Sequence, residues 1–197
     1  GPAFTVTVTV NPKPEIPAQT ATICSSNAFT TSPVNAAPTT IVPINTTYTW
    51  TVATNTNVTG QSDQTTPQTN ISQTLTNITN VAQYVVYTVT PTSGADGACV
   101  GSSFTITVTV NPKPFVSTQT TSTCSESAFS VSPANAVTSN IVPTGTTYAW
   151  SAPVVTGDMT GGVVATGQTN INGNLTNPTN IVQTATYTVI PTSGTAG

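Results

Sequence analysis

Apolar and polar residues alternate strictly in two segments of the chain that lie one hundred residues apart. In residues 104–110 a phenylalanine, an isoleucine and two valines alternate with three threonines, and residues 4–10 repeat the pattern with a valine in place of the isoleucine. Because successive side chains of a β-strand point to opposite faces, this period of two predicts a strand with one buried face. Asn-Pro-Lys-Pro follows each copy, and proline ends a strand because it provides no N–H group. We therefore expect each copy to be the last strand of a domain, followed by a stiff joint.

The rest of the chain predicts further short strands and shows no helical periodicity. Runs rich in Val, Ile, Thr and Tyr alternate with Pro, Asn, Gly and Ser clusters about every eight to twelve residues, as in a β-sandwich. Trp50 and Tyr87 are expected in the core, and Trp150 and Tyr187 are their counterparts one period later. Strands are expected at residues 16–24, 28–34, 46–52, 70–77 and 83–90, with loops at 35–45, 55–68 and 92–103.

The chain is a tandem repeat. Residues 4–97 align with 104–197 without an insertion, and about half of the paired positions are identical. Such self-similarity predicts two small all-β antiparallel sandwich domains from a longer row of similar units. The linker prolines are Pro12, Pro14, Pro112 and Pro114.

The repeat motif also predicts where the domains begin and end. Gly1-Pro2 is typical of the remnant of a cleaved purification tag. Residues 1–14 would then combine that remnant with the closing strand and linker of a preceding repeat. Residues 15–112 would form a complete repeat, and residues 113–197 a second repeat without its own closing strand. We expect residues 4–10 of one molecule to fill the gap in another copy by strand addition.

Composition restricts the partners. Charged residues make up 4% of the chain, with five acids, two lysines and no arginine, for a net charge of -3. Nucleic-acid binding needs clustered basic residues, and an anionic membrane surface needs a basic patch, so neither partner is expected. No stretch reaches the roughly 18 apolar residues of a membrane span. The apolar fraction of 36% nevertheless predicts a folded chain.

The residue types needed for catalysis are scarce. There is no histidine, so a Ser-His-Asp or Cys-His device cannot be built. A hydrolase with paired carboxylates needs two acids about 5 to 9 Å apart, and calcium needs six to eight oxygen ligands. Solvated loop acids are the better interpretation of Glu15, Asp63, Asp96, Glu126 and Asp158. We expect no enzyme, no metal and no cofactor.

The three cysteines follow the repeat. Cys124 is the copy of Cys24, whereas the copy of Cys99 would fall just past the end of the chain. This arrangement predicts a Cys24–Cys99 disulfide within one repeat and a free Cys124, and hence an oxidising environment. The alternative is two buried free thiols, because sequence does not show that the two sulfurs meet.

A Trp on a central strand, a Tyr on the penultimate strand and a Thr/Val strand that closes on Asn-Pro occur together in this chain. The residues are Tyr48-Thr49-Trp50, Tyr87-Thr88-Val89, residues 105–112, Ile23-Cys24-Ser25 and residues 98–101. Over nearly its whole length the chain resembles the immunoglobulin-like PKD-type repeats of giant Bacteroidota surface adhesins, including the gliding-motility adhesins exported by the type IX system. One departure is that the acidic turn after the Trp strand, found in many PKD domains, is missing.

The resemblance implies a stiff, rod-forming stalk on the bacterial cell surface, with neighbouring repeats of the same protein as its partners. The alternative is a module that binds polysaccharide through residues 55–68 and 157–168. The two repeats diverge most in these segments, as binding loops on a constant scaffold would.

Overall fold

The computed structural model of the chain describes residues 1–94, 97–136 and 139–194, and its regular structure over these residues consists of β-strands. The chain divides into two compact units. The first comprises Gly1–Thr76 and Tyr84–Val110, and the second comprises Asn77–Gln83 and Asn111–Gly197. Among the described residues there is no helix long and apolar enough to cross a membrane. The expected all-β fold with two tandem sandwich repeats is confirmed.

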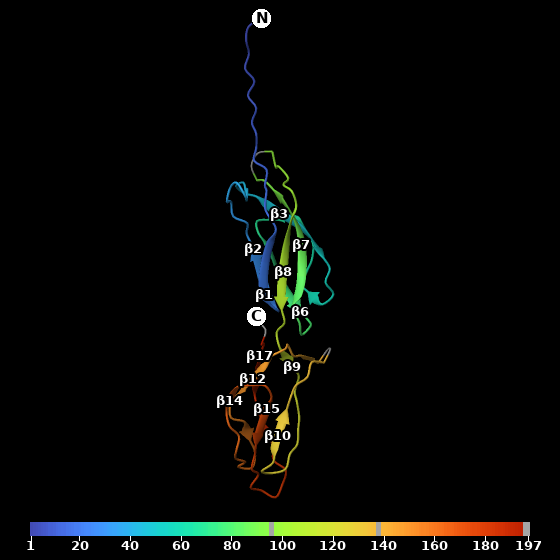
Figure 1. Ribbon diagram of the computed structural model, residues 1–197, viewed down its shortest axis with the longest axis vertical. Helices are drawn as coiled ribbons and strands as arrows, with labels where there is room; N and C mark the ends of the chain where they lie inside the picture. Colours follow the sequence, from blue (N-terminus) through green and yellow to red (C-terminus); the bar gives the residue numbers. More distant parts are fainter. Residues whose placement is uncertain (95–96, 137–138, 195–197) are drawn as a thin grey trace. The chain divides into compact units, whose positions relative to one another are not determined.

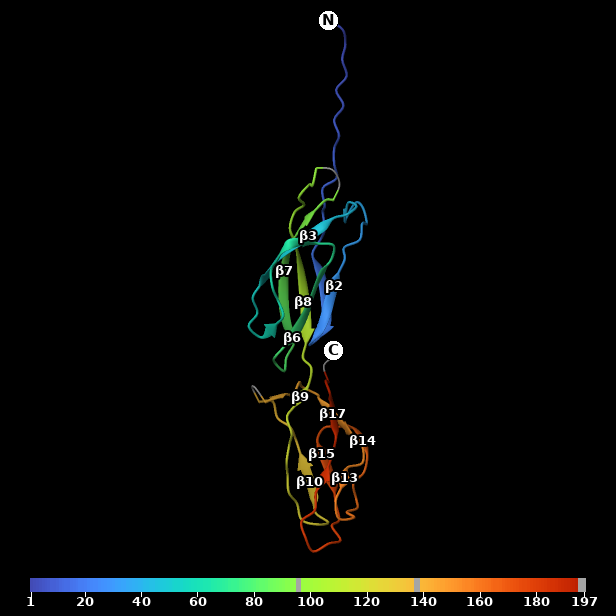
Figure 2. The same cartoon turned by 180° about the vertical axis from the view of Figure 1, so that it is seen from behind.

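The first unit is a sandwich of two sheets (Figures 1 and 2). Outside residues 55–68, its strands lie within a few residues of the ranges predicted from the sequence. In spatial order, the larger sheet contains β1 (Gln19–Cys24), β8 (Phe104–Asn111), β7 (Gln83–Thr92), β3 (Thr47–Ala53) and β5 (Gln64–Gln68). The smaller sheet contains β2 (Asn27–Thr31), β6 (Ile71–Asn77) and β4 (Val58–Thr59).

The core of the first unit lies between the two sheets. In β7 the apolar side chains of Val85, Tyr87 and Val89 are fully buried, and the residues between them are exposed or half-buried. The ring of Phe29 on β2 lies 5.1 Å from the ring of Tyr87, so the sheets are in direct contact. Each such side chain stabilises the fold by about 1.5–3 kcal/mol.

Strand β8 lies inside the larger sheet, between β1 and β7 (Figure 1). Its four apolar residues are at most 5% exposed, and the threonines between them are exposed or half-buried. Gly101, which precedes β8, lies close to Pro14, which precedes β1. The two strands therefore begin at the same end of the sheet and run parallel.

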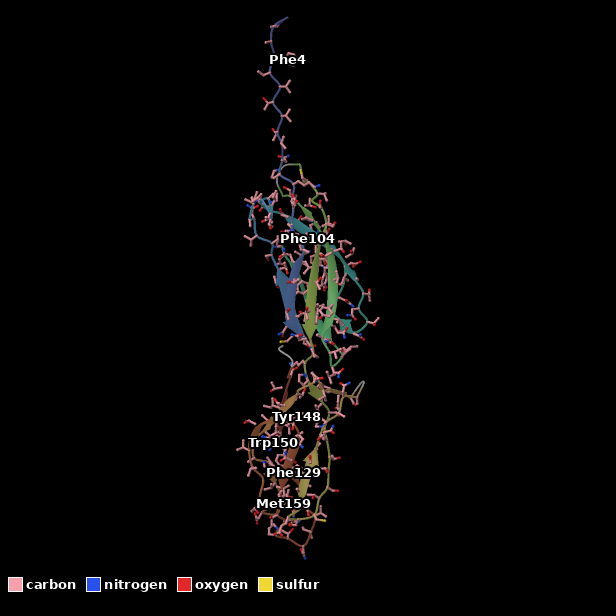
Figure 3. The ribbon with its side chains drawn as sticks, in the orientation of Figure 1. Phe4, Phe104, Phe129, Tyr148, Trp150 and Met159 are labelled. Atoms are coloured by element: carbon pink, nitrogen blue, oxygen red, sulfur yellow. The ribbon has the colours of Figure 1, made fainter. Side chains whose placement is uncertain are left out.

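Residues 4–10 carry the same alternation as β8 but form no strand (Figure 1). Figure 3 labels Phe4 on this segment and Phe104 inside the sandwich. We refer to residues 3–10 as the N-terminal arm. Its apolar side chains are exposed: Phe4 by 87%, Val6 by 75%, Val8 by 76% and Val10 by 86%.

Residues 55–68 contain two short strands where the sequence predicted a polar loop. Strand β4 pairs with β6, and β5 pairs with β3 with a register shift between Tyr48 and Trp50. Pro67 lies within β5, which is possible because β5 is an edge strand and one side of it needs no ladder hydrogen bonds. An edge strand formed by backbone pairing of polar residues shows no apolar alternation in the sequence.

The second unit contains shorter versions of several of these elements. Its core consists of Phe129, Tyr148, Trp150 and Ile171. The strands are β9 (Phe115–Val116) paired with β11 (Asn140–Ile141), β10 (Ala128–Val131) paired with β15 (Ile171–Asn174), β12 (Thr147–Trp150) between β14 (Ala165–Gln168) and β17 (Val189–Thr192), and β13 (Val154–Val155) paired with β16 (Ala185–Thr186).

Candidate functional site

A polar network in the first unit joins the two core aromatic residues that the sequence predicted. The Trp50 indole Nε1 donates to the backbone oxygen of Ser62 at 3.1 Å, and the Tyr87 hydroxyl donates to Gln73 Oε1 at 2.8 Å. The Gln73 amide donates in turn to the same Ser62 oxygen at 2.8 Å. Burial raises the pKa of the Tyr87 hydroxyl far above its usual value, because desolvation disfavours the charged form. The network orders the core and presents no reactive group.

The second unit keeps the aromatic packing but not this network. Trp150 Nε1 donates to the backbone oxygen of Val163 at 3.1 Å, and the ring of Tyr187 lies 5.6 Å from that of Phe129. Position 173 is a glycine, where the first repeat has a glutamine. Within the described residues the Tyr187 hydroxyl makes no hydrogen bond, and its side chain is half-buried.

The variable segment of the first repeat, residues 55–68, is held by hydrogen bonds within the segment and to β3. Gln61 Nε2 donates to the backbone oxygen of Asn55 at 2.6 Å, and Asp63 Oδ1 accepts from the Val52 backbone N–H at 2.8 Å. The Trp50 side chain beside this loop is 5% exposed. These two bonds therefore close the first part of the loop and attach it to β3.

Three of the acidic residues are distinguished by their backbone hydrogen bonds or backbone dihedral angles. Glu15 pairs with Ile41 through two backbone hydrogen bonds, and Glu126 and Asp158 have φ values of 65° and 54°. Of these two residue types, aspartate is the one that tolerates a positive φ in turns. Asp96 lies outside the described residues. Within the described part of the chain, no group of three or more His, Cys, Asp or Glu residues could hold a metal ion.

The predicted Cys24–Cys99 bridge is not formed, and Cys24, Cys99 and Cys124 are all free. Cys24 ends β1, whereas Cys99 lies in the loop that leads to Gly101, beside Pro14 at the start of β1. The six residues of β1 span about 20 Å at about 3.3 Å per residue. Disulfides need Cα atoms within about 7 Å. Pairing cysteines by their order in the repeat therefore gave a wrong prediction, because the two residues lie at opposite ends of one sheet.

The linker prolines lie directly after each copy of the alternating motif. Pro12 is exposed and Pro14 is fully buried, whereas Pro112 is buried and Pro114 is half-buried. Strand β8 ends at Asn111 and β9 begins at Phe115. Only three residues, two of them proline, therefore separate the last strand of one sheet from the first strand of the next.

An open groove of about 1090 Å³ lies in the second unit. One wall consists of residues 116–125 and the other of residues 179–187, and Phe129, Tyr148 and Ile171 lie between them. Figure 3 labels Phe129, Tyr148 and Met159, which line the groove. In the first unit the corresponding walls contain β1 and β7, and β8 fills the space between them.

Sequence reasoning missed Gln73, Ser62 and a buried turn asparagine. Asn77 Oδ1 accepts from the Thr79 backbone N–H at 2.8 Å, and Asn177 makes the same bond to Thr179 at 2.9 Å. The signal was present, since both repeats carry Asn-x-Thr-Asn at this position, and asparagine side chains stabilise turns in this way. No comparable signal marks Gln73, because its contact with Tyr87 depends on how the two sheets face each other.

A family model described as a PKD-like domain matches residues 21–114 and 121–197. The comparisons with curated proteins and with solved structures give no match.

Proposed function

The chain belongs to the family of PKD-like domains, and from this we propose that it is a pair of spacer repeats from the stalk of a large secreted bacterial surface adhesin. PKD-like domains are commonly extracellular structural or adhesion modules, and their immunoglobulin-type fold is typically non-catalytic. The stalk would hold a binding region away from the cell for attachment or gliding. Location at the bacterial cell surface and export by the type IX route are parts of this proposal.

The observation that carries the proposal is the joint of Pro112, Lys113 and Pro114 between β8 and β9. Proline fixes one of the two soft backbone dihedrals, and proline-rich linkers act as semi-rigid spacers. A joint of three residues with two prolines has few conformations, as a stalk that keeps its length requires. The nearly uncharged surface, with 4% charged residues, supports the same role because it leaves few charges to attract neighbouring stalks.

Small-angle X-ray scattering, extrapolated to zero protein concentration, tests the stiffness of the joint. We expect the full chain to give a single well-defined maximum dimension. Replacing both Pro112 and Pro114 by glycine should lower the mean radius of gyration and broaden the distance distribution.

Pro12→Gly is the matched control, because it changes the copy of the motif that does not lie between the two units. It should leave the scattering of the two units unchanged. Wild-type scattering that is indistinguishable from that of the double glycine variant would contradict the stalk.

The cellular location is tested separately with antibodies raised against the chain. They should label intact, unpermeabilised cells of the source organism. Labelling that appears only after permeabilisation would contradict a cell-surface role.

A further inference from the structure

We propose that the N-terminal arm of one molecule inserts as a strand into the open groove of the second unit of another molecule, so that the chain assembles head to tail. The inference does not depend on the stalk function, because it concerns only surfaces within this chain. Its two parts are the exposed arm and the groove between residues 116–125 and 179–187.

The groove lies at the place in the second unit that β8 occupies in the first unit. In the first unit β8 is hydrogen-bonded to β1 on one side and to β7 on the other. One period later, residues 119–124 form no strand where β1 would be, and only β16 and β17 remain of the counterpart of β7. Both walls therefore have backbone N–H and C=O groups available for a strand that lies between them.

The side chains around the groove are also incompletely covered. Val85, Tyr87 and Val89 are each 0% exposed beside β8. Their counterparts Ala185, Tyr187 and Val189 are only half-buried, and all three line the groove. The comparison of the two repeats within one chain shows what a strand in this position covers.

The arm matches β8 in sequence. Residues 4–10 are identical to residues 104–110 except for Val6, which stands where β8 has Ile106. The side chains that β8 buries are the ones that the arm exposes, including Val8 at 76% against Val108 at 0%. The single difference makes the arm smaller by one methylene, so it introduces no steric clash. Neither segment carries a charge.

The joint that follows the arm favours insertion of the arm into a second molecule over insertion into its own chain. Asn11-Pro12-Lys13-Pro14 repeats the sequence that links β8 to β9, and Glu15 pairs with Ile41 as Phe115 pairs with Ile141. An inserted arm would therefore place a first unit after a second unit, through the same kind of joint. Insertion of the arm into the second unit of its own chain would close a ring of two units that are connected by two three-residue joints. Between molecules the contact is heterologous and can continue from copy to copy.

Sedimentation velocity of the full chain over a range of concentrations tests the assembly. We expect monomers at low concentration and a growing series of oligomers at higher concentration. Val8→Asp would bury an unpaired carboxylate in the groove, so it should weaken association by at least ~100-fold. A wild-type chain that stays monomeric throughout would overturn the proposal.

Thr5→Asp is the matched control, since it adds the same charge to the arm at a position whose counterpart Thr105 is exposed in β8. It should associate like the wild type. Both substitutions lie in a segment that forms no strand, so neither should change the folding of the units. Equal association of the Val8→Asp and wild-type chains would contradict insertion of the arm.

Hydrogen exchange distinguishes insertion into the groove from pairing of arms with one another. Upon association, amides of residues 117–124 and 184–190 should become protected together with those of the arm. Protection of the arm alone would overturn the proposal. A chain without residues 3–10 should also bind a labelled peptide of residues 3–11. It should bind the same peptide carrying Val8→Asp at least ~100-fold more weakly. Equal binding of the two peptides would contradict insertion into the groove.

Discussion

One valine position occurs in both copies of the motif and is buried in one copy and exposed in the other. This difference allows a matched test of the fold. Val108 in β8 is 0% exposed and Val8 in the arm is 76% exposed. Val108→Ala removes two methyl groups from the core of the first unit. The lost transfer free energy is about 1.6 kcal/mol at about 0.8 kcal/mol per group, and the cavity adds about 1 kcal/mol. We expect the free energy of unfolding of the first unit to fall by about 2–3 kcal/mol.

Urea denaturation followed by hydrogen exchange of individual peptides measures this effect. With a slope of about 1–3 kcal/mol per molar urea, the transition of β7 and β8 peptides should move to lower urea by about 1 M or more. Peptides from β12 and β15 report the second unit and should not move. The measurement is made at a concentration where the chain is monomeric.

Val8→Ala is the control, and it should change stability by less than about 0.5 kcal/mol. Equal destabilisation by the two substitutions would mean that the arm is buried in its own monomer. A negligible effect of Val108→Ala would mean that β8 is not part of the core. The first result would refute the exposure of the arm, and the second would refute the assignment of β8 as the strand that closes the first unit.

Three further outcomes follow from the core and the cysteines. Tyr87→Phe should cost about 0.5–1.5 kcal/mol in urea unfolding because it removes the hydrogen bond from the Tyr87 hydroxyl to Gln73 Oε1, whereas Tyr187→Phe should cost less than that; equal costs would contradict the difference between the two networks. Burial raises the pKa of Tyr87 above the ordinary value of 10.0, so the Tyr87 hydroxyl loses its proton in the unfolded chain before it does so in the folded chain. The free energy of unfolding should therefore fall as pH rises above about 10. Tyrosinate absorbance during unfolding measures this ionisation, and an unchanged free energy of unfolding up to about pH 12 would contradict the prediction. A reductant should leave the unfolding transition unchanged, and thiol titration in urea without reductant should find all three cysteines; fewer thiols would restore the disulfide.

The strands of the first repeat were predictable because each has one buried face and one solvated face. In β3 the apolar residues recur at every second position, so the burial of Trp50 followed from the period. In β7 the buried residues alternate in the same way, although Tyr84 and Val86 on the other face are also apolar. Strand β5 was not predictable in this way. It is an edge strand of polar residues, and its position depends on pairing with β3 rather than on its own pattern.

The contacts between sheets could not be obtained from the sequence. The bond from Tyr87 to Gln73 requires the register of both strands and the way the sheets face each other. The cysteine prediction failed for a related reason, since position in a repeat does not say at which end of a strand a residue lies. The arm carries the same alternation as β8 but is exposed, so the alternation alone does not say which copy of the motif is buried.

The parallel run of β1 and β8 determines how the first unit would respond to a pulling force. Force enters after Pro14 at the start of β1 and leaves through Asn111 at the end of β8. It therefore pulls two adjacent strands past each other along their length, and the hydrogen bonds between them are strained together in shear rather than broken one after another. Resistance to forced unfolding depends on the rate of that rupture and not on equilibrium stability. In the second unit this shear seam exists only when a strand occupies the groove, so an unfilled unit would be the first to give way under tension.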